Sequence, residues 1–300
     1  MIISTDNSVM RYAFGDKESI RMCKEAGFDG IDYSLFKMQP DNDILNLPDE
    51  ERKALAYDLR NYAEKIGICF PQAHSDFELR YGEGKDSLHY HNLMRSLEFA
   101  SWMGIPQIVV HTVKYGIPED DSFDVLEYNV PFFGDLIPVA EKLNLKIGME
   151  NLFIKKKNGD FNYIGVLGTA EEMNSYRDSF NSDVFVTCCD IGHAAVVGVD
   201  PAEFIRGMSK DKLTMLHVQD TDFKGDRHWL PYIGKHDWNS VTSALAEIGY
   251  EGNMNLEVLH FYDRFPTKEL MQSALCHAAR VARHLADEVE AKKAALGAEI

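Results

Sequence analysis

Residues 184–208, VFVTCCDIGHAAVVGVDPAEFIRGM, contain the pattern that decides the fold. The first seven of these residues form an apolar run rich in β-branched side chains, which predicts a buried strand over 184–190. The segment PAEFIRGM, residues 201–208, then has the amphipathic spacing of a helix. A strand that is followed by a helix is part of a βαβ unit, so this stretch predicts a parallel sheet covered by helices.

The same pattern recurs from one end of the chain to the other. Candidate strands cover residues 2–7, 29–35, 68–74, 107–113, 146–152, 184–190, 213–219 and 254–259. Helical patterns lie between them at 17–27, 49–67, 87–104, 125–144, 169–180, 201–208 and 238–249, and a long one starts at about Pro266. Gly67 and Gly104 stand where a helix should end, just before the next strand. Eight such units, without a GxGxxG motif after the first strand, predict a closed (β/α)8 TIM barrel of the α/β class.

Length and composition favour one domain. The chain has 300 residues, of which 45% are hydrophobic, and it contains no linker or low-complexity tract. We therefore predict a single barrel domain over residues 1–300. Its Ala-rich C-terminal segment is predicted to be helical, with an extension past the barrel at about 286–300 that either frays or contacts a partner, such as a second copy in a homo-oligomer.

The net charge and the cysteine content limit the possible binding partners and the cellular compartment. The formal net charge is -17 and no Lys/Arg cluster stands out, which argues against a nucleic-acid partner held by its backbone. Five cysteines without a CxxC motif favour a reducing compartment. The N-terminus lacks the basic and apolar regions of a signal peptide, and no apolar run approaches the ~20 residues of a membrane span. We expect a cytoplasmic protein with no membrane partner.

Ionisable residues fall at the ends of the predicted strands. In chain order, they are His74, His111, Glu150, Asp190, His217 and Glu257. The C-terminal ends of barrel strands meet at one mouth, so these side chains should surround one cavity. Each alone has an ordinary structural explanation, such as a rim salt bridge or a satisfied core histidine. Together, three converging carboxylates would repel one another without a cation, which predicts a divalent metal held by Glu150, Asp190, His217 and Glu257.

The type of ligand restricts the metal. Two Glu, one Asp and one His suit Mn²⁺, Mg²⁺, Co²⁺ or Zn²⁺ better than an ion that prefers thiolates. Cys188 and Cys189 directly precede Asp190, but two adjacent strand residues cannot both face the interior, and we interpret them as packing residues.

Two predicted loops add polar residues above the mouth. His193 follows the sixth strand, and Asp226, Arg227 and His228 lie in a long loop after the seventh. An arginine there is suited to hold an oxyanion, a hydroxyl or a phosphate of a substrate. The alternative is a surface arginine that pairs with Asp222 or Asp226.

The motifs GMEN, CDIGH, LHVQD, GDRHWLPYIGKHDW and NLEV, in this order, resemble the xylose-isomerase-like barrel superfamily. The likeness covers about residues 2–285 and is strongest to the sugar phosphate isomerase/epimerase group, which includes ketose 3-epimerases, hydroxypyruvate isomerases and inosose-processing enzymes. It implies one divalent ion, commonly Mn²⁺, on the four ligands given above. It also implies that Glu150 and Glu257 exchange protons with the substrate, and that substrate oxygens contact the remaining polar residues of the mouth, which are His74, His111, His193, Asp226, Arg227 and His228.

The sequence thus favours an isomerase or epimerase of a small sugar or sugar-like keto compound, which acts by proton transfer through a metal-stabilised enediolate. Three alternatives stay open: a lyase or dehydratase that uses the same metal site, a non-enzymatic carbohydrate sensor, and an abasic-site endonuclease with three zinc ions. The resemblance offers a candidate for each of the nine ligands of that nuclease, but the low basic content disfavours it. Tyr232 and Lys235 are unusual residues for the corresponding loop of the sugar isomerase/epimerase group, so the identity of the substrate stays open. The absence of a Gly-rich phosphate loop favours an unphosphorylated substrate.

Overall fold

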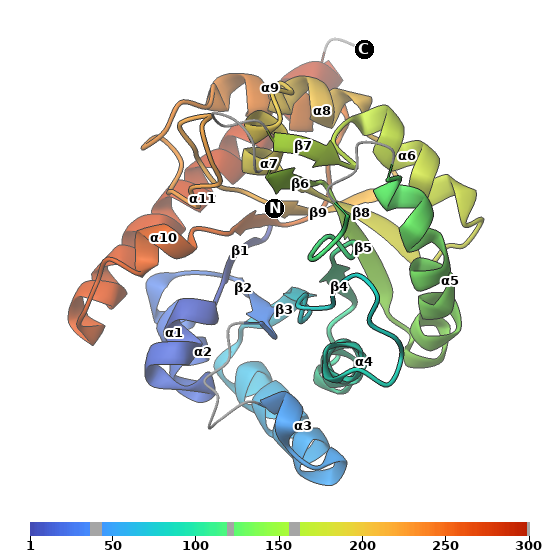
Figure 1. Ribbon diagram of the computed structural model, residues 1–300. Helices are drawn as coiled ribbons and strands as arrows, with labels where there is room; N and C mark the ends of the chain where they lie inside the picture. The colour runs from blue at the N-terminus through green and yellow to red at the C-terminus, as the bar shows by residue number, and fades with distance from the viewer. Residues whose placement is uncertain (37–43, 119–122, 156–162, 299–300) are drawn as a thin grey trace.

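The computed structural model describes residues 1–36, 44–118, 123–155 and 163–298. Eight parallel strands form a nearly closed barrel in the order β10-β1-β2-β3-β4-β5-β8-β9 (Figure 1). They are β1 Ile3–Asp6, β2 Gly30–Ser34, β3 Cys69–His74, β4 Gln107–Val110, β5 Lys146–Glu150, β8 Phe185–Asp190, β9 Leu213–His217 and β10 Met254–Leu256. A parallel bridge between Val218 and Leu256 joins the last two. The predicted (β/α)8 TIM barrel is confirmed, and each predicted strand is shorter by one to three residues in total.

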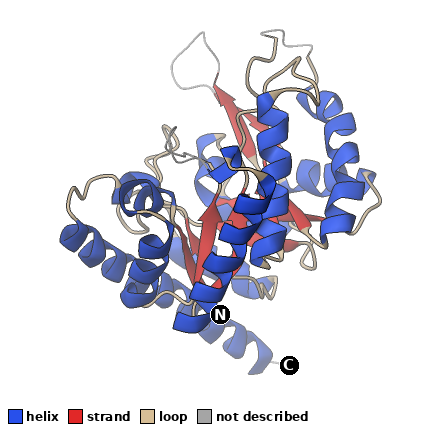
Figure 2. Ribbon diagram, turned by 90° about the horizontal axis from the view of Figure 1, so that it is seen from below, coloured by secondary structure: helices blue, strands red, loops and turns tan. Residues whose placement is uncertain are grey.

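Helices surround the strands on the outside of the barrel (Figures 1 and 2). The long ones are α2 Asp16–Ala26, α3 Asp49–Ile66, α4 Leu88–Met103, α5 Val125–Leu143, α6 Ala170–Ser179, α9 Trp238–Glu247 and α11 Lys268–Ala298. The short ones are α1 Ser8–Phe14, η1 Ile44–Asn46, α7 Ile191–Val196, α8 Pro201–Gly207 and α10 Leu259–Tyr262. Gly67 and Gly104 end α3 and α4 with φ of 73° and 74°, a left-handed conformation that glycine adopts without strain. All eight predicted helices are present.

The barrel interior and the layer under the helices are separate apolar regions. Val109, Val186, Cys188 and Met215 form a small cluster, whereas Cys189 belongs to the large core. The two cysteines therefore pack on opposite sides of β8, as successive residues of a strand must. Burial raises the pKa of the Cys188 thiol to about 12, so it stays protonated at neutral pH. The interpretation of both residues as packing residues is confirmed.

A hairpin follows β5 that the sequence did not predict. Strands β6 (Leu152–Lys155) and β7 (Tyr163–Val166) pair antiparallel in a sheet of their own, which extends away from the barrel strands (Figure 2). Phe153 on β6 and Tyr163 on β7 lie diagonally across this strand pair, with their ring centroids 4.9 Å apart. This hairpin places Phe153 near the end of β5, where Glu150 is found.

The C-terminal helix α11 is continuous through Ala298. Ala286 and Val289 are buried, and Lys292 donates hydrogen bonds to the backbone and side chain of Asn239 in α9. The first turns of the predicted extension at 286–300 thus pack against the barrel, while the domain boundary itself stays a prediction. Of the described helices, none has the length and apolar character that crossing a membrane requires.

Candidate metal centre and active-site cavity

Four predicted ligands meet at the C-terminal mouth of the barrel. Glu150, Asp190 and His217 are the last residues of β5, β8 and β9, and Glu257 directly follows β10. All four are buried, and one oxygen or nitrogen of each lies within 4.8 Å of the others. The barrel closure therefore brings together residues that span more than a third of the chain. Their predicted convergence is observed, and their role as ligands stays a prediction.

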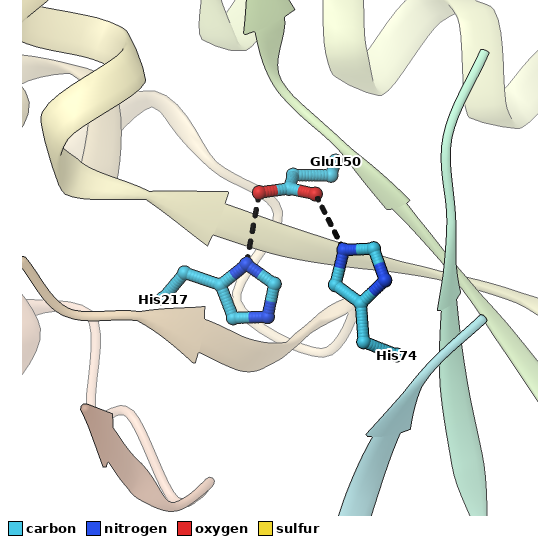
Figure 3. Close-up of side chains that lie close together, drawn as sticks. All are labelled: His74, Glu150 and His217. Carbon is cyan, nitrogen blue, oxygen red and sulfur yellow. Dashed lines mark hydrogen bonds and ion pairs between the residues drawn. The ribbon is translucent and has the colours of Figure 1, made fainter. Parts of the chain in front are cut away.

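Glu150 is the centre of the group and lies within 4.0 Å of four imidazoles, those of His74, His111, His193 and His217. Its Oε1 lies 2.8 Å from Nδ1 of His217, and its Oε2 lies 2.7 Å from Nε2 of His111. His74 Nε2 is 3.8 Å from the same Oε2, on the other side of the carboxylate from His217 (Figure 3). Burial alone would raise the pKa of Glu150, but His217 and His111 hold it well below its usual range. Glu150 is therefore a carboxylate at neutral pH.

Three further polar residues form a second group beside the first. Asp226 lies in the loop after β9, with its Oδ2 2.9 Å from Nε2 of His228 and 3.4 Å from Nε2 of His193. Gln219 connects the two groups, because its Nε2 donates to Oδ1 of Asp226 at 2.7 Å and to Oδ2 of Asp190 at 3.1 Å. The predicted loop residues His193, Asp226 and His228 thus reach the mouth together.

Backbone carbonyls fix the orientation of three of the imidazoles. The histidines are His74, His193 and His228, and each Nδ1 lies 2.9 Å from a carbonyl oxygen, of Ser75, Asn151 and Glu257 respectively. A carbonyl only accepts, so each Nδ1 carries a hydrogen, and in the neutral ring each Nε2 presents a lone pair toward the carboxylates. Imidazoles that bind metals are usually held in this way, by a hydrogen bond from the other ring nitrogen.

The donor set tests whether these residues fit a cation. An imidazole lone pair that faces a carboxylate oxygen at 2.9 Å is repulsive unless a proton or a cation lies between them. Burial would lower the pKa of His228, the ring at this distance, but Asp226 and Glu257 raise it well above its usual value. Asp190 and Asp226 likewise raise the pKa of His193, 3.4 Å from the same oxygen, to about 9. In the metal-free chain a proton therefore has this role. A dication would take the place of that proton, because metal ligands bind in their deprotonated form. The residues fit a divalent metal, and the identity of the metal stays open.

Asp32, which the sequence analysis did not select, supports His217 from below. The Oδ2 atom of this buried residue in β2 lies 3.3 Å from Nε2 of His217. The same oxygen accepts hydrogen bonds from Gln72 at 2.7 Å and from Asn255 at 2.9 Å. Asp32 thus faces the ring nitrogen opposite the one that contacts Glu150. The signal in the sequence is a charged residue in the middle of the buried strand GIDYS, where only apolar side chains are expected without a partner.

A cavity of about 410 Å³ opens above the two groups. Its floor includes Glu150, Asp226 and Glu257, together with the histidines His74, His111, His193 and His228. Rings of Phe36, Phe77, Tyr115 and Phe153 line its walls. A polar floor under aromatic walls is typical of a site for a small ligand with several hydroxyl groups. A larger hollow of about 690 Å³ lies at the opposite end of the barrel, where Gln107, Thr214 and Asn253 contribute amides and a hydroxyl.

Arg227 is placed differently from the other predicted substrate contacts. Its guanidinium binds both carboxylate oxygens of Asp222 at 3.1 Å and lies 5.9 Å from the ring of Trp229. It does not belong to the residues that line the described part of the cavity. The surface pairing that the sequence left open as an alternative is the one observed, and a contact with substrate stays a prediction for this residue.

The chain is similar to known barrels over nearly its whole length. The family model described as "Xylose isomerase-like TIM barrel" matches residues 20–280. An uncharacterised protein from Methanocaldococcus jannaschii is 30% identical over 156 residues, which is 51% of this chain and 50% of that protein. Another from Sinorhizobium fredii is 27% identical over 193 residues, 62% of this chain and 57% of that protein. The chain spans about half the length of these curated relatives.

Solved structures share the fold at low identity. A D-tagatose 3-epimerase-like protein superimposes with a TM-score of 0.73 at 20% identity, covering 97% of this chain and 99% of that one. A D-psicose 3-epimerase solved in the presence of D-fructose gives 0.71 at 16% identity, covering 95% and 99%. The IolI protein solved with a bound zinc atom gives 0.70 at 17% identity, covering 98% and 99%. At these identities the likeness establishes the barrel fold.

Proposed function

Because the chain belongs to the xylose isomerase-like TIM barrel family, we propose that it is a metal-dependent isomerase or epimerase of a small sugar or sugar-like keto compound. The observation that carries the proposal is the pair of buried carboxylates, Glu150 and Glu257, at the floor of the cavity. Both lie near Nδ1 of His217, at 2.8 and 3.3 Å. Two carboxylates that share a site divide the work of removing and returning a proton.

The four ligands suggested by the sequence, Glu150, Asp190, His217 and Glu257, would hold the divalent ion. Such an ion polarises a carbonyl and its neighbouring hydroxyl, which acidifies the hydrogen on the carbon between them. Mn²⁺ is our first choice, with Mg²⁺, Co²⁺ and Zn²⁺ as alternatives, since an O/N donor set of this composition suits all of them. The zinc of the IolI neighbour supports a metal in this fold.

The two carboxylates differ in the way that a proton transfer needs. The imidazoles of His217 and His111 keep Glu150 ionised, so it can act as a base. In the metal-free chain burial raises the pKa of Glu257 to about 7. A bound dication would lower this pKa, so Glu257 would give up its proton on metal binding and could then take one from the substrate and return it. One carboxylate oxygen takes the proton from carbon, which leaves an enediolate, and a protonated carboxyl returns it. Return to the other face of the same carbon gives an epimer, and return to the neighbouring carbon gives the aldose–ketose isomer.

The remaining polar residues of the cavity would bind hydroxyl groups of the substrate. His74, His111 and His193 present ring nitrogens toward the cavity floor, and Asp226 and His228 lie beside them. The apolar walls exclude water from the enediolate, which would otherwise be protonated by solvent. We expect a small-molecule carbohydrate as the only partner needed for turnover, without nucleic acid or membrane.

Hydrogen exchange tests this proposal directly. The purified protein is loaded with Mn²⁺ and incubated in D₂O with a panel of ketoses, ketose phosphates, keto acids of sugars and inososes. Deuterium should enter a carbon-bound position, and Glu257→Gln, which keeps the shape but cannot carry the proton, should lose exchange by about 10²-fold or more while it keeps the fold. Absence of exchange with every compound contradicts the proposal. Irreversible loss of water or of an aglycone would favour the lyase alternative.

A second candidate function rests on the group of His193, Asp226 and His228. Because this group is a third possible cation site next to those around Glu150, the mouth offers ligands for three ions, as the abasic-site endonuclease alternative requires. Zinc analysis and an abasic DNA duplex distinguish the two functions. One ion per chain and an intact duplex support the isomerase, whereas three zinc ions and a nicked strand support the nuclease.

A further inference from the structure

Lys114 brings a positive charge into the wall of the cavity. It follows β4, three residues after His111, and it is partly buried. Its Nζ lies 5.0 Å from the ring centroid of Phe153 and 5.7 Å from that of Tyr115, and all three residues line the cavity. The ammonium group is thus held by the faces of two aromatic rings, in the lining of a cavity whose floor is acidic.

Among the described residues, none places an anionic group at contact distance from the ammonium group of Lys114. Within the residues that the structure describes, no hydrogen bond and no ion pair of 4.0 Å or less is found for Lys114. Burial lowers the pKa of Lys114, and the more distant carboxylates of Glu150, Asp226 and Asp190 oppose that shift. A cation that is removed from water without a paired anion costs free energy, and cation–π contacts offset only part of that cost.

Binding of the proposed metal makes this imbalance larger. A dication on the floor compensates the carboxylates, so they attract the ammonium group less strongly. The wall then presents an unpaired positive charge to whatever occupies the cavity. We propose that the natural substrate carries an anionic group, a carboxylate or a phosphate, and that Lys114 binds it. This inference rests on the proposed function and adds the chemical class of the substrate.

Other cations are less suited to this role. Arg227 is occupied by Asp222, and the ammonium group of Lys155, which also lines the cavity, is on an exposed residue where solvent screens its charge. An ammonium group is a point charge that binds an anion without the fixed fork geometry of arginine. A single lysine therefore recognises the charge of a substrate without needing a Gly-rich phosphate loop, so the lack of that loop does not exclude a phosphate.

A matched set of ligands tests the inference. D-Fructose, D-fructose 6-phosphate and D-fructuronate differ only at carbon 6, which is part of a hydroxymethyl group, of its phosphate ester or of a carboxylate. Calorimetric titration of the metal-loaded protein should give at least one anionic ligand a dissociation constant about 10-fold or more below that of D-fructose. The anionic ligand with the lower dissociation constant shows whether the natural substrate carries a phosphate or a carboxylate. The advantage should shrink when salt is raised.

Variants assign the effect to Lys114. Lys114→Met should remove the anionic advantage and leave the affinity for D-fructose within about 3-fold, whereas Lys114→Arg should retain most of it. Lys155→Met is the matched control and should keep the advantage. Failure of both anionic ligands to bind more tightly than D-fructose, or an advantage that persists in Lys114→Met, overturns the inference.

A purely local role for Lys114 gives a different result. If the lysine only compensates the acidic floor, Lys114→Met changes the affinity for Mn²⁺ and alters the binding of all three ligands by the same factor, which also overturns the inference. These titrations need no turnover, so they are independent of the deuterium exchange experiment. Binding of an anion by Lys114 without any exchange would contradict the proposed function alone.

Discussion

Asp32→Asn should weaken metal binding although Asp32 is not itself a proposed metal ligand. The carboxylate of Asp32 lies 3.3 Å from Nε2 of His217, whose other ring nitrogen faces the carboxylates of the proposed centre. A carboxylate behind a metal-binding imidazole fixes its orientation and makes the ring a stronger donor. An asparagine keeps the shape, and its oxygen can still accept from Gln72 and Asn255. It lacks the negative charge that strengthens the donor.

The magnitude follows from the type of contact. Loss of such a partner costs about 10- to 100-fold in metal affinity, or about 1.4 to 2.7 kcal/mol. The 3.3 Å separation is longer than an ideal charge-assisted hydrogen bond, so we expect a loss nearer to about 10-fold. Asp32 is 1% exposed, so solvent does not screen its charge.

Competition with a chromophoric chelator measures the affinity of each variant for Mn²⁺ and Zn²⁺. Asp6→Asn is the matched control, because Asp6 is also 1% exposed and is the partner of Asp32 in the β1–β2 register, but it bonds to Ser8. It removes a buried charge from the same part of the barrel without removing a partner of His217. An affinity that is unchanged within about 2-fold in Asp32→Asn, or an equal loss in Asp6→Asn, would show that Asp32 does not strengthen metal binding through His217.

Three further predictions concern the same centre. Because the pKa of His193 rises from 6.5 to about 9 on folding, its contribution of about 3 kcal/mol is fully present below pH 6.5 and is lost as the pH rises through 9. The melting temperature of the metal-free protein should therefore fall over this window, and a flat profile would count against the protonated imidazole. Metal binding at pH 7 should release about one proton or more, seen as a dependence of the calorimetric heat on the ionisation enthalpy of the buffer; identical heats in two buffers would contradict it. In Gly192→Ala, the new Cβ would lie 2.5 Å from Cδ of Gln219, and displacing this amide should weaken Mn²⁺ binding about 10-fold, whereas an unchanged affinity would show that Gln219 does not organise the two groups.

The parts of the fold that the sequence predicted are those with a strong local pattern. A strand such as 184–190 is buried on both faces, so its apolar run is continuous, and helices such as α3 and α4 end at a glycine with positive φ. The short helices α1, α7 and α10 were missed because each begins within three residues of the end of a strand and is too short to show a helical period. The hairpin β6–β7 was missed because its first strand begins two residues after Glu150, so one apolar run covers two elements.

The candidate site was predictable to the extent that it depends on strand ends. Glu150 and Asp190 were located correctly because a parallel barrel places every strand end at the same mouth. The orientation of a side chain within a long loop depends instead on partners far away in the sequence. Arg227 therefore pairs with Asp222, although the sequence also allowed it to reach the cavity. The role of Asp32 was not predicted because its partner His217 lies on another strand, and only the closed barrel brings the two side chains together.

Anomalous diffraction from crystals grown with Mn²⁺ or Zn²⁺ would show whether the four strand-end residues share one ion. We expect a peak between Glu150, Asp190, His217 and Glu257, at about 2.0 to 2.2 Å from the coordinating atoms, as expected for zinc bound to oxygen and nitrogen. Data at the absorption edge identify the ion and count the occupied positions. Crystals that bind no ion at these residues at saturating metal, or an ion held only elsewhere, would contradict the account.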